Sequence, residues 1–119
     1  FKPHRAPGKK LKTNKGGMTI KLEPTIDIAA RLGSLKRQNQ LLVGFALETD
    51  NELDNALEKM NRKNLDLIVL NSLNDEGAGF RTDTNKVTLI DKNNNTAAFE
   101  LKSKSDVADD ILDKIEEML

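Results

Sequence analysis

The sequence predicts an α/β fold, and a parallel βαβ unit in its middle is the main reason. LLVGFALE (41–48) and LDLIVLNSL (65–73) are almost continuously apolar, as is typical of parallel strands buried on both faces. Between them, residues 50–63 predict a helix. Four of its apolar residues recur at the spacing of one helix face: Leu53, Ala56, Leu57 and Met60. With a right-handed crossover, 41–73 would form one βαβ unit.

The segments before this unit predict a loop, a strand and a helix. Residues 1–17 combine Pro, Gly and Lys without periodicity, so we expect a mobile basic loop. MTIKL (18–22) alternates as a short strand does, and residues 25–32 read as a helix. The spacing of Thr49 and Glu52 predicts a capping box that opens the following helix.

The segments after this unit predict a hairpin and a helix. KVTLID (86–91) and TAAFEL (96–101) flank KNNN, where Asn tolerates the positive φ of a tight turn. Residues 105–119 predict an amphipathic helix. Its apolar face holds five residues: Val107, Ile111, Leu112, Ile115 and Met118. The predicted class is therefore three-layer, Rossmann-like α/β, with residues 18–119 as the core.

Composition limits the possible functions. Net charge is zero, but all 19 Asp and Glu residues follow Leu22, whereas the first 22 residues hold seven of the 19 Lys and Arg. A basic leader on an acidic body favours a local anion site, and 3% aromatic content argues against a nucleic-acid binder. We find no apolar run that could span a membrane, and the chain has no cysteine, so we expect a cytoplasmic protein. Its Phe-Lys-Pro opening suggests a fragment.

Lys59 and Lys63, in EKMNRKNLDLIVLN, are the most specific candidates for an anion site. They lie one turn apart on one helix face, where two ammonium groups repel each other unless an anion sits between them. Alternatively, they are solvated lysines favoured by the helix dipole and by nearby carboxylates. Those carboxylates would be Glu52, Asp54 and Glu58.

Three further segments are candidates, each with a plainer alternative. GKKLKTNKGG could gather lysines on phosphates, or form only a basic tail. The helix start at PTIDIAA could seat an anion on its free N–H groups, or Asp27 could simply cap it. Phe45 could offer its ring to a nucleobase, or belong to the core. The sequence contains no Cys/His metal set and no Ser-His-Asp constellation, so no metal ligands are predicted.

The order of these motifs and their residues resemble those of a known family. FKP, GKKLK, MTIKLEPTIDI, LLVGFALETDN, EKMNRKNLDLIVLN and GFRTDTNKVTLID are similar to phosphopantothenoylcysteine synthetase. More narrowly, they resemble the C-terminal half of the synthetase part of the bacterial bifunctional phosphopantothenoylcysteine decarboxylase/synthetase of coenzyme A biosynthesis. The resemblance covers essentially all 119 residues. It implies that residues 1–119 are the second half of a larger domain, whose first half is missing.

The resemblance implies a ligase that forms an amide bond and uses CTP with Mg²⁺. CTP would activate 4′-phosphopantothenate as an acyl-cytidylate, and cysteine would attack it to give 4′-phosphopantothenoylcysteine, CMP and pyrophosphate. The family implies a homodimer or larger homo-oligomer, with FMN only in a fused decarboxylase domain. This fragment alone would be inactive. The alternatives are a non-catalytic nucleotide- or phosphate-binding module and a basic-loop interaction domain without a small ligand.

The same resemblance implies roles for individual residues. Lys10 matches a flexible-loop lysine that contacts the phosphates and the acyl-cytidylate, and we expect it to stabilise the transition state. Lys59 and Lys63 match two helix lysines that bind CTP, and Phe45 matches a phenylalanine that contacts the nucleotide. The remaining nucleotide contacts match the helix start: Ile26, Asp27, Ile28 and Ala29.

Overall fold

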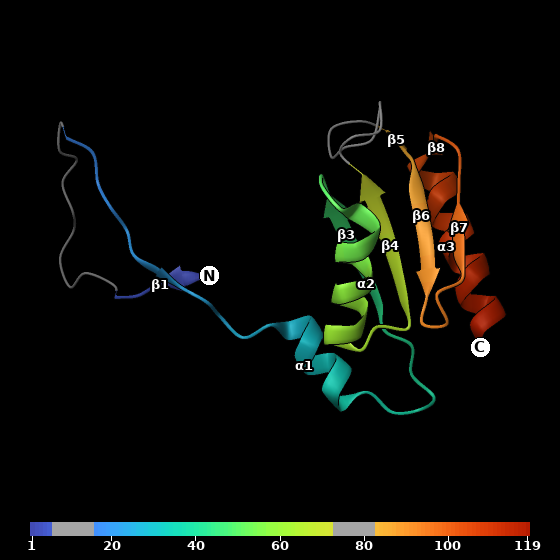
Figure 1. Cartoon of the computed structure of the whole chain (residues 1–119), viewed down its shortest axis with the longest axis horizontal. Coiled ribbons are helices and arrows are strands. Elements are labelled where there is room, and N and C mark those ends of the chain that lie inside the picture. Colours follow the sequence, from blue (N-terminus) through green and yellow to red (C-terminus); the bar gives the residue numbers. More distant parts are fainter. Residues whose placement is uncertain (6–15, 73–82) are drawn as a thin grey trace.

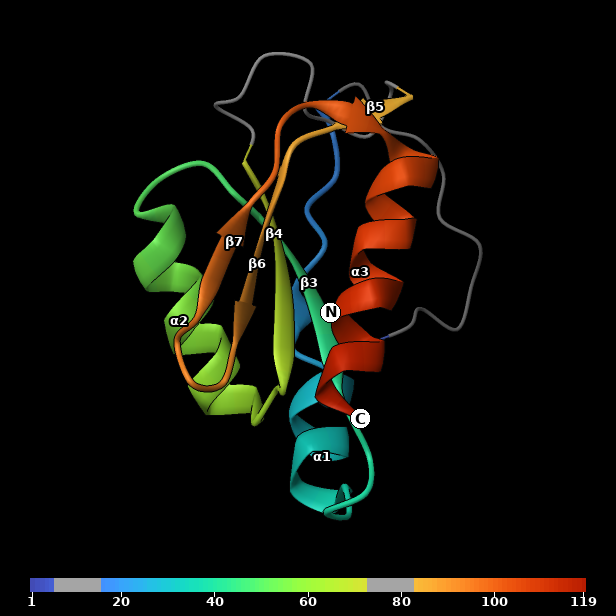
Figure 2. The ribbon, with the colours of Figure 1, turned by 90° about the vertical axis from the view of Figure 1, so that its right-hand side faces the viewer.

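The computed structural model describes residues 1–5, 16–72 and 83–119, in which two helices cover a mixed sheet (Figures 1 and 2). The strands are β1 (Lys2–Pro3), β2 (Leu22–Glu23), β3 (Val43–Glu48), β4 (Leu67–Ser72), β5 (Thr84–Asn85), β6 (Val87–Asp91), β7 (Thr96–Ala98) and β8 (Lys102–Ser103). The helices are α1 (Ile28–Leu35), α2 (Glu52–Lys63) and α3 (Lys104–Met118).

The main sheet has the strand order β3-β4-β6-β7. β3 and β4 run parallel and in register, from Val43 opposite Leu67 to Glu48 opposite Ser72, with α2 as their crossover. β6 is antiparallel to β4, and β7 is antiparallel to β6. Figure 2 shows α2 on one face of this sheet and α3 on the other. The predicted βαβ unit, antiparallel hairpin and three-layer α/β class are therefore confirmed.

Alternation along the strands divides the core into two clusters, one on each face of the sheet. The cluster beneath α2 comprises Ala46, Ala56, Met60, Leu65, Ile68, Leu70 and Ile90. The cluster beneath α3 comprises Leu67, Val69, Val87, Leu89 and Val107. Because β4 has helices on both faces and strands on both sides, Leu67 through Leu70 are all buried. That explains the unbroken apolar run in its sequence.

β3 has a similar apolar sequence but is an edge strand, which corrects the prediction that it is buried. Its one neighbour in the main sheet is β4. Ala46 is 4% exposed. The preceding residue, Phe45, lies on the opposite face of the strand and is 69% exposed. An apolar run therefore identified a parallel strand here but could not tell how well it is covered.

Two predictions for the N-terminal part were wrong in detail. MTIKL does not form a strand along its length; only Leu22–Glu23 pairs with Lys2–Pro3, because no other described segment lies alongside to complete a ladder. The first helix begins at Ile28, later than expected, because the backbone of Asp27 is extended and its side chain caps the helix.

The start of α2 and two core predictions also need correction. Asn51, in the left-handed region at φ 45°, is the N-cap, so the prediction that Thr49 opens this helix is wrong; the Asn51 side chain makes no capping bond. Glu52 accepts a hydrogen bond from the Ser72 hydroxyl. Leu53 and Leu112 are 49% and 62% exposed, because Leu53 lies in the first turn of α2 and Leu112 lies at the margin of the apolar face of α3.

Candidate functional site

The predicted site residues lie in several parts of the fold, and one lies outside its description. Lys10 falls within residues 6–15, which are not among the described residues. Lys59 and Lys63 lie on α2, and Asp27 lies at the start of α1. Phe45 lies on β3, on the sheet face that carries α3. The described residues therefore do not bring all the candidates into one pocket.

A close contact between α1 and α2 fixes one group of candidates. Gly33 approaches the end of α2 so closely that a Cβ atom there would stand 1.8 Å from the carbonyl oxygen of Lys63. The Asn64 side-chain amide donates a 2.9 Å hydrogen bond to the Gly33 carbonyl. This packing places Asp27 Oδ2 3.4 Å from Lys63 Nζ and 3.9 Å from Arg62. Gly33 is therefore required for the α1–α2 junction.

Asp27 uses its two carboxylate oxygens differently. Oδ1 accepts a 3.1 Å hydrogen bond from the Ala30 N–H, which caps α1, while Oδ2 faces Lys63. The Ala30 hydrogen bond and the nearby positive charges lower the pKa of Asp27. Asp27 therefore caps α1, and whether the helix start also binds a nucleotide stays a prediction. Ile26 and Ile28 on either side are 78% and 71% exposed, and Ala29 is half-buried.

Each lysine of the pair has its own carboxylate partner. Lys59 Nζ contacts Glu48 Oε1 at the end of β3, whereas Lys63 reaches Asp27 on α1. The repulsion between the two ammonium groups is thus relieved without an intervening anion. The partners also differ from those the sequence suggested, because Glu58 pairs with Arg62 at 3.0 Å. Whether either lysine binds a nucleotide stays a prediction.

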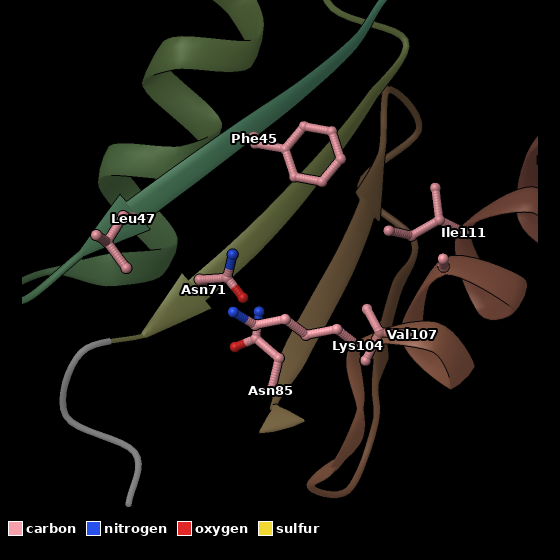
Figure 3. Close-up of a pocket in the computed structure, with 8 residues that line it drawn as sticks. Phe45, Leu47, Asn71, Asn85, Lys104, Val107 and Ile111 are labelled. Atoms are coloured by element: carbon pink, nitrogen blue, oxygen red, sulfur yellow. The ribbon is translucent and has the colours of Figure 1, made fainter. Parts of the chain in front are cut away.

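A pocket of about 290 Å³ opens on the α3 face, beside the carboxyl end of the parallel pair (Figure 3). Its lining residues are Phe45, Leu47, Asn71, Asn85, Lys104, Val107, Ala108 and Ile111. β3 and α3 supply apolar walls that face each other, and the Asn71 amide lies between them. A predominantly apolar pocket with a few polar groups is the usual form of a small-molecule site.

Asn71 is a polar residue of this pocket that the sequence analysis did not single out. Its side-chain Oδ1 atom is buried, yet none of the described residues donates a hydrogen bond to it. Buried polar atoms are nearly always paired, so an orphaned acceptor at a pocket wall is a place for a ligand donor. The available signal was its position, since Asn71 follows the apolar run LIVL near the carboxyl end of a parallel strand, where α/β proteins bind ligands.

Carboxylates elsewhere in the described ranges do not form a metal centre. No group of three or more His, Cys, Asp or Glu residues there is arranged to hold an ion. The same ranges contain no helix that is both long and apolar enough to cross a membrane.

The comparisons with known proteins identify the family of the chain. The family model described as "DNA/pantothenate metabolism flavoprotein C-terminal domain" matches residues 1–119. The chain belongs to this family. As a member of the flavoprotein C-terminal domain family, it shares the mixed α/β fold with a parallel strand pair.

Several curated proteins are similar to this family member. It is 60% identical over 115 residues to a protein named "Cysteine/Cysteine sulfinic acid decarboxylase", from an unknown prokaryotic organism. It is 44% identical over 115 residues to the coenzyme A biosynthesis bifunctional protein CoaBC of Bacillus subtilis, and 39% identical over 106 residues to that of Haemophilus influenzae. These alignments take in 97%, 97% and 89% of the chain but only 32%, 28% and 26% of the respective relatives.

Two solved structures are also similar. The C-terminal domain of a CoaBC bifunctional protein superposes with a TM-score of 0.69 at 39% identity, over 83% of this chain and 44% of the other. The DNA/pantothenate metabolism flavoprotein from Streptococcus pneumoniae gives a TM-score of 0.65 at 23% identity, over 85% and 42% of the two chains, and supports the fold alone. The resemblance to the synthetase part of the bifunctional protein is thus confirmed.

Proposed function

We propose that this chain is the C-terminal part of a CTP-dependent phosphopantothenate–cysteine ligase of coenzyme A biosynthesis. In the first step, a carboxylate oxygen of 4′-phosphopantothenate attacks the α-phosphorus of CTP and pyrophosphate leaves. In the second step, the cysteine amine attacks the acyl carbon and CMP leaves. Family membership supports the pathway, and the similarity to CoaBC proteins supports the synthetase reaction.

The observation that carries the proposal is the pocket beside Phe45. It lies on the α3 face towards the carboxyl ends of two parallel strands, the position at which open α/β sheets bind ligands. Phe45 presents a largely exposed ring there, and Asn71 directs an unpaired acceptor to the same place. An aromatic face and a side-chain amide together suit a nucleotide, whose base stacks and whose polar groups need partners.

The lysines would supply positive charge outside this pocket. Nucleotidyl transfer spreads negative charge over phosphate oxygens, so a fixed ammonium group aimed at them lowers the barrier. Lys59 lies at the end of β3 on the α2 face, next to Glu48, and Lys63 lies beside the start of α1. Because β3 is an edge strand, a ligand that wraps around this edge would contact both faces. We propose that Lys10 closes over the acyl-cytidylate and excludes water.

The proposal needs no dedicated metal cage. Mg²⁺ usually reaches such sites bound to phosphates, with one or two carboxylates and several waters. We treat Mg²⁺ as part of the nucleotide substrate, and FMN as belonging to a fused decarboxylase domain. We further propose that the chain is the second half of a larger domain and works as a homodimer or larger homo-oligomer.

The similarity to the relative named a decarboxylase favours a second candidate. At 60% identity, that relative shares more of this sequence than the CoaBC proteins do. The segment would then be a non-catalytic nucleotide- or phosphate-binding module of a protein with another activity. It would keep the fold and the pocket but show no preference for CTP.

Calorimetric titration of the chain with CTP and with ATP tests the first candidate. We expect binding that favours CTP and that weakens about tenfold, or ~1.4 kcal/mol, in each of Phe45→Ala, Lys63→Ala and Lys10→Gln. Lys114→Ala is the matched control. Lys114 is a half-buried lysine on α3, and its ammonium group lies 3.5 Å from the carboxylate of Asp91. Equal affinity for both nucleotides would favour the binding module. No binding of either nucleotide would reject both candidates.

A further inference from the structure

We propose that Glu48 is a positioning residue that holds the Lys59 ammonium group at the carboxyl end of β3. This inference deepens the proposed function and rests on it, since the positioned charge is meant for a nucleotide phosphate. The geometry assigns the role to Glu48 through three features: its place in the strand, its second partner and its burial relative to Lys59.

Glu48 is fixed by the fold. It is the last residue of β3, lies opposite Ser72 in the parallel register, and shares the α2 face with the buried Ala46. Its side chain is 11% exposed. A carboxylate at the end of a paired strand has little freedom, so it offers its oxygens from a defined place.

Asn55 holds the other oxygen of the same carboxylate. Its side-chain amide lies 3.4 Å from Glu48 Oε2 and donates a 2.8 Å hydrogen bond to the carbonyl of Asp50. Asn55 therefore ties the carboxylate to the turn between β3 and α2. Oε1 is left to accept from Lys59.

The pair presents its positive end outward. The Lys59 side chain is 34% exposed and the Glu48 side chain 11%, so Lys59 is the more accessible partner of the pair. Partly exposed ion pairs contribute little to stability, which leaves positioning as the function of this contact. A ligand phosphate would meet Lys59 before it met Glu48.

Two readouts on the same variants test this role. The first is the rate at which an amine-acetylating reagent labels Lys59, followed by mass spectrometry of the chain without nucleotide. Because a neutral amide holds the ammonium group less firmly than a carboxylate does, Glu48→Gln should speed the labelling of Lys59 about threefold and leave that of Lys114 unchanged. The second is calorimetric binding of CTP, which Glu48→Gln should weaken about fivefold.

A double-mutant cycle separates positioning from a general effect on the fold. If Glu48 acts through Lys59, Glu48→Gln should weaken CTP binding no further once Lys59→Ala is present. Asp110→Asn is the control, because it removes another helix–strand ion pair, with Lys102, on the α3 side of the sheet. It should leave the dissociation constant for CTP unchanged.

The outcomes distinguish the two proposals. Unchanged labelling of Lys59 in Glu48→Gln would overturn the positioning role whatever happens with CTP. Fully additive effects in the cycle would overturn it as well. If the unmodified chain does not bind CTP, the proposed function fails, while the labelling rate still decides whether Glu48 holds Lys59.

Discussion

The two ends of the parallel strand pair use similar residues in opposite ways. Before the amino end of β4, Asp66 is 2% exposed and accepts hydrogen bonds from Lys36 at 2.7 Å, the Leu42 N–H at 2.8 Å and Lys92 at 3.3 Å. At the carboxyl end, Asn71 Oδ1 has no donor among the described residues, and the Glu48–Lys59 pair is partly open to solvent.

This difference separates residues that stabilise the fold from residues that are available to a ligand. A buried carboxylate whose two oxygens are both hydrogen-bonded within the protein holds chain segments together and is not available to a ligand. An orphaned acceptor and a half-exposed cation are poor stabilisers but available partners. A charged or polar residue whose hydrogen-bonding groups are paired within the protein therefore points to a structural role. One whose groups are left unpaired points to ligand binding.

Removing Asp66 should have the largest effect. Asp66→Ala would leave Lys36 beside a buried cavity and the Leu42 N–H without its acceptor, so we expect a loss of about 3 kcal/mol in the free energy of unfolding. Glu48→Ala, at the carboxyl end of the parallel pair, should lower the free energy of unfolding by less than about 1 kcal/mol. Urea denaturation measures both, and similar losses would break the proposed contrast between the two ends.

The loss of stability at low pH provides a second test of the role of Asp66. Burial by itself would raise the pKa of Asp66, but the hydrogen bonds from Lys36 and Leu42 outweigh it and hold that pKa below its ordinary value of 3.8. A lowered pKa stabilises the fold above the unfolded-state value, and this stability disappears as pH falls through the folded-state value. Asp66→Asn should therefore be less stable at pH 7 and lose less on acidification below about pH 4.

Gly33→Ala should have an intermediate effect, because it forces α1 away from α2. The new methyl group would overlap the Lys63 carbonyl oxygen, so we expect a loss of about 1–3 kcal/mol, only partly offset by better helix propensity. Lys63 should also separate from Asp27 and label faster with the acetylating reagent. Gly16→Ala is the control, since no atom lies within 4 Å of a Cβ there. Equal thermal stability of the two variants would contradict the close packing.

Asn71→Leu should have the smallest effect on stability. Replacing an orphaned buried acceptor with an apolar side chain of similar size should change the free energy of unfolding by less than about 1 kcal/mol. The same change should weaken CTP binding, because a ligand donor loses its acceptor. Paired denaturation and calorimetry measure the two effects. A large loss of stability together with unchanged binding would place Asn71 in the scaffold and not in the site.

The sequence alone determined the α/β class, the parallel unit and the hairpin. These follow from short-range patterns, since apolar runs and helical spacing reflect how each segment is covered. It also determined the family, through motifs spread along the whole chain. The positions of the candidate residues on their helices and strands followed from the same patterns.

Only the tertiary structure decided which of these residues meet. The apolar runs of β3 and β4 look alike, yet one lies at the sheet edge and leaves Phe45 exposed. Lys59 and Lys63 share a helix face, yet they pair with carboxylates from different elements. The physical reason is that pairing and exposure depend on groups distant in the chain, which a local pattern does not contain.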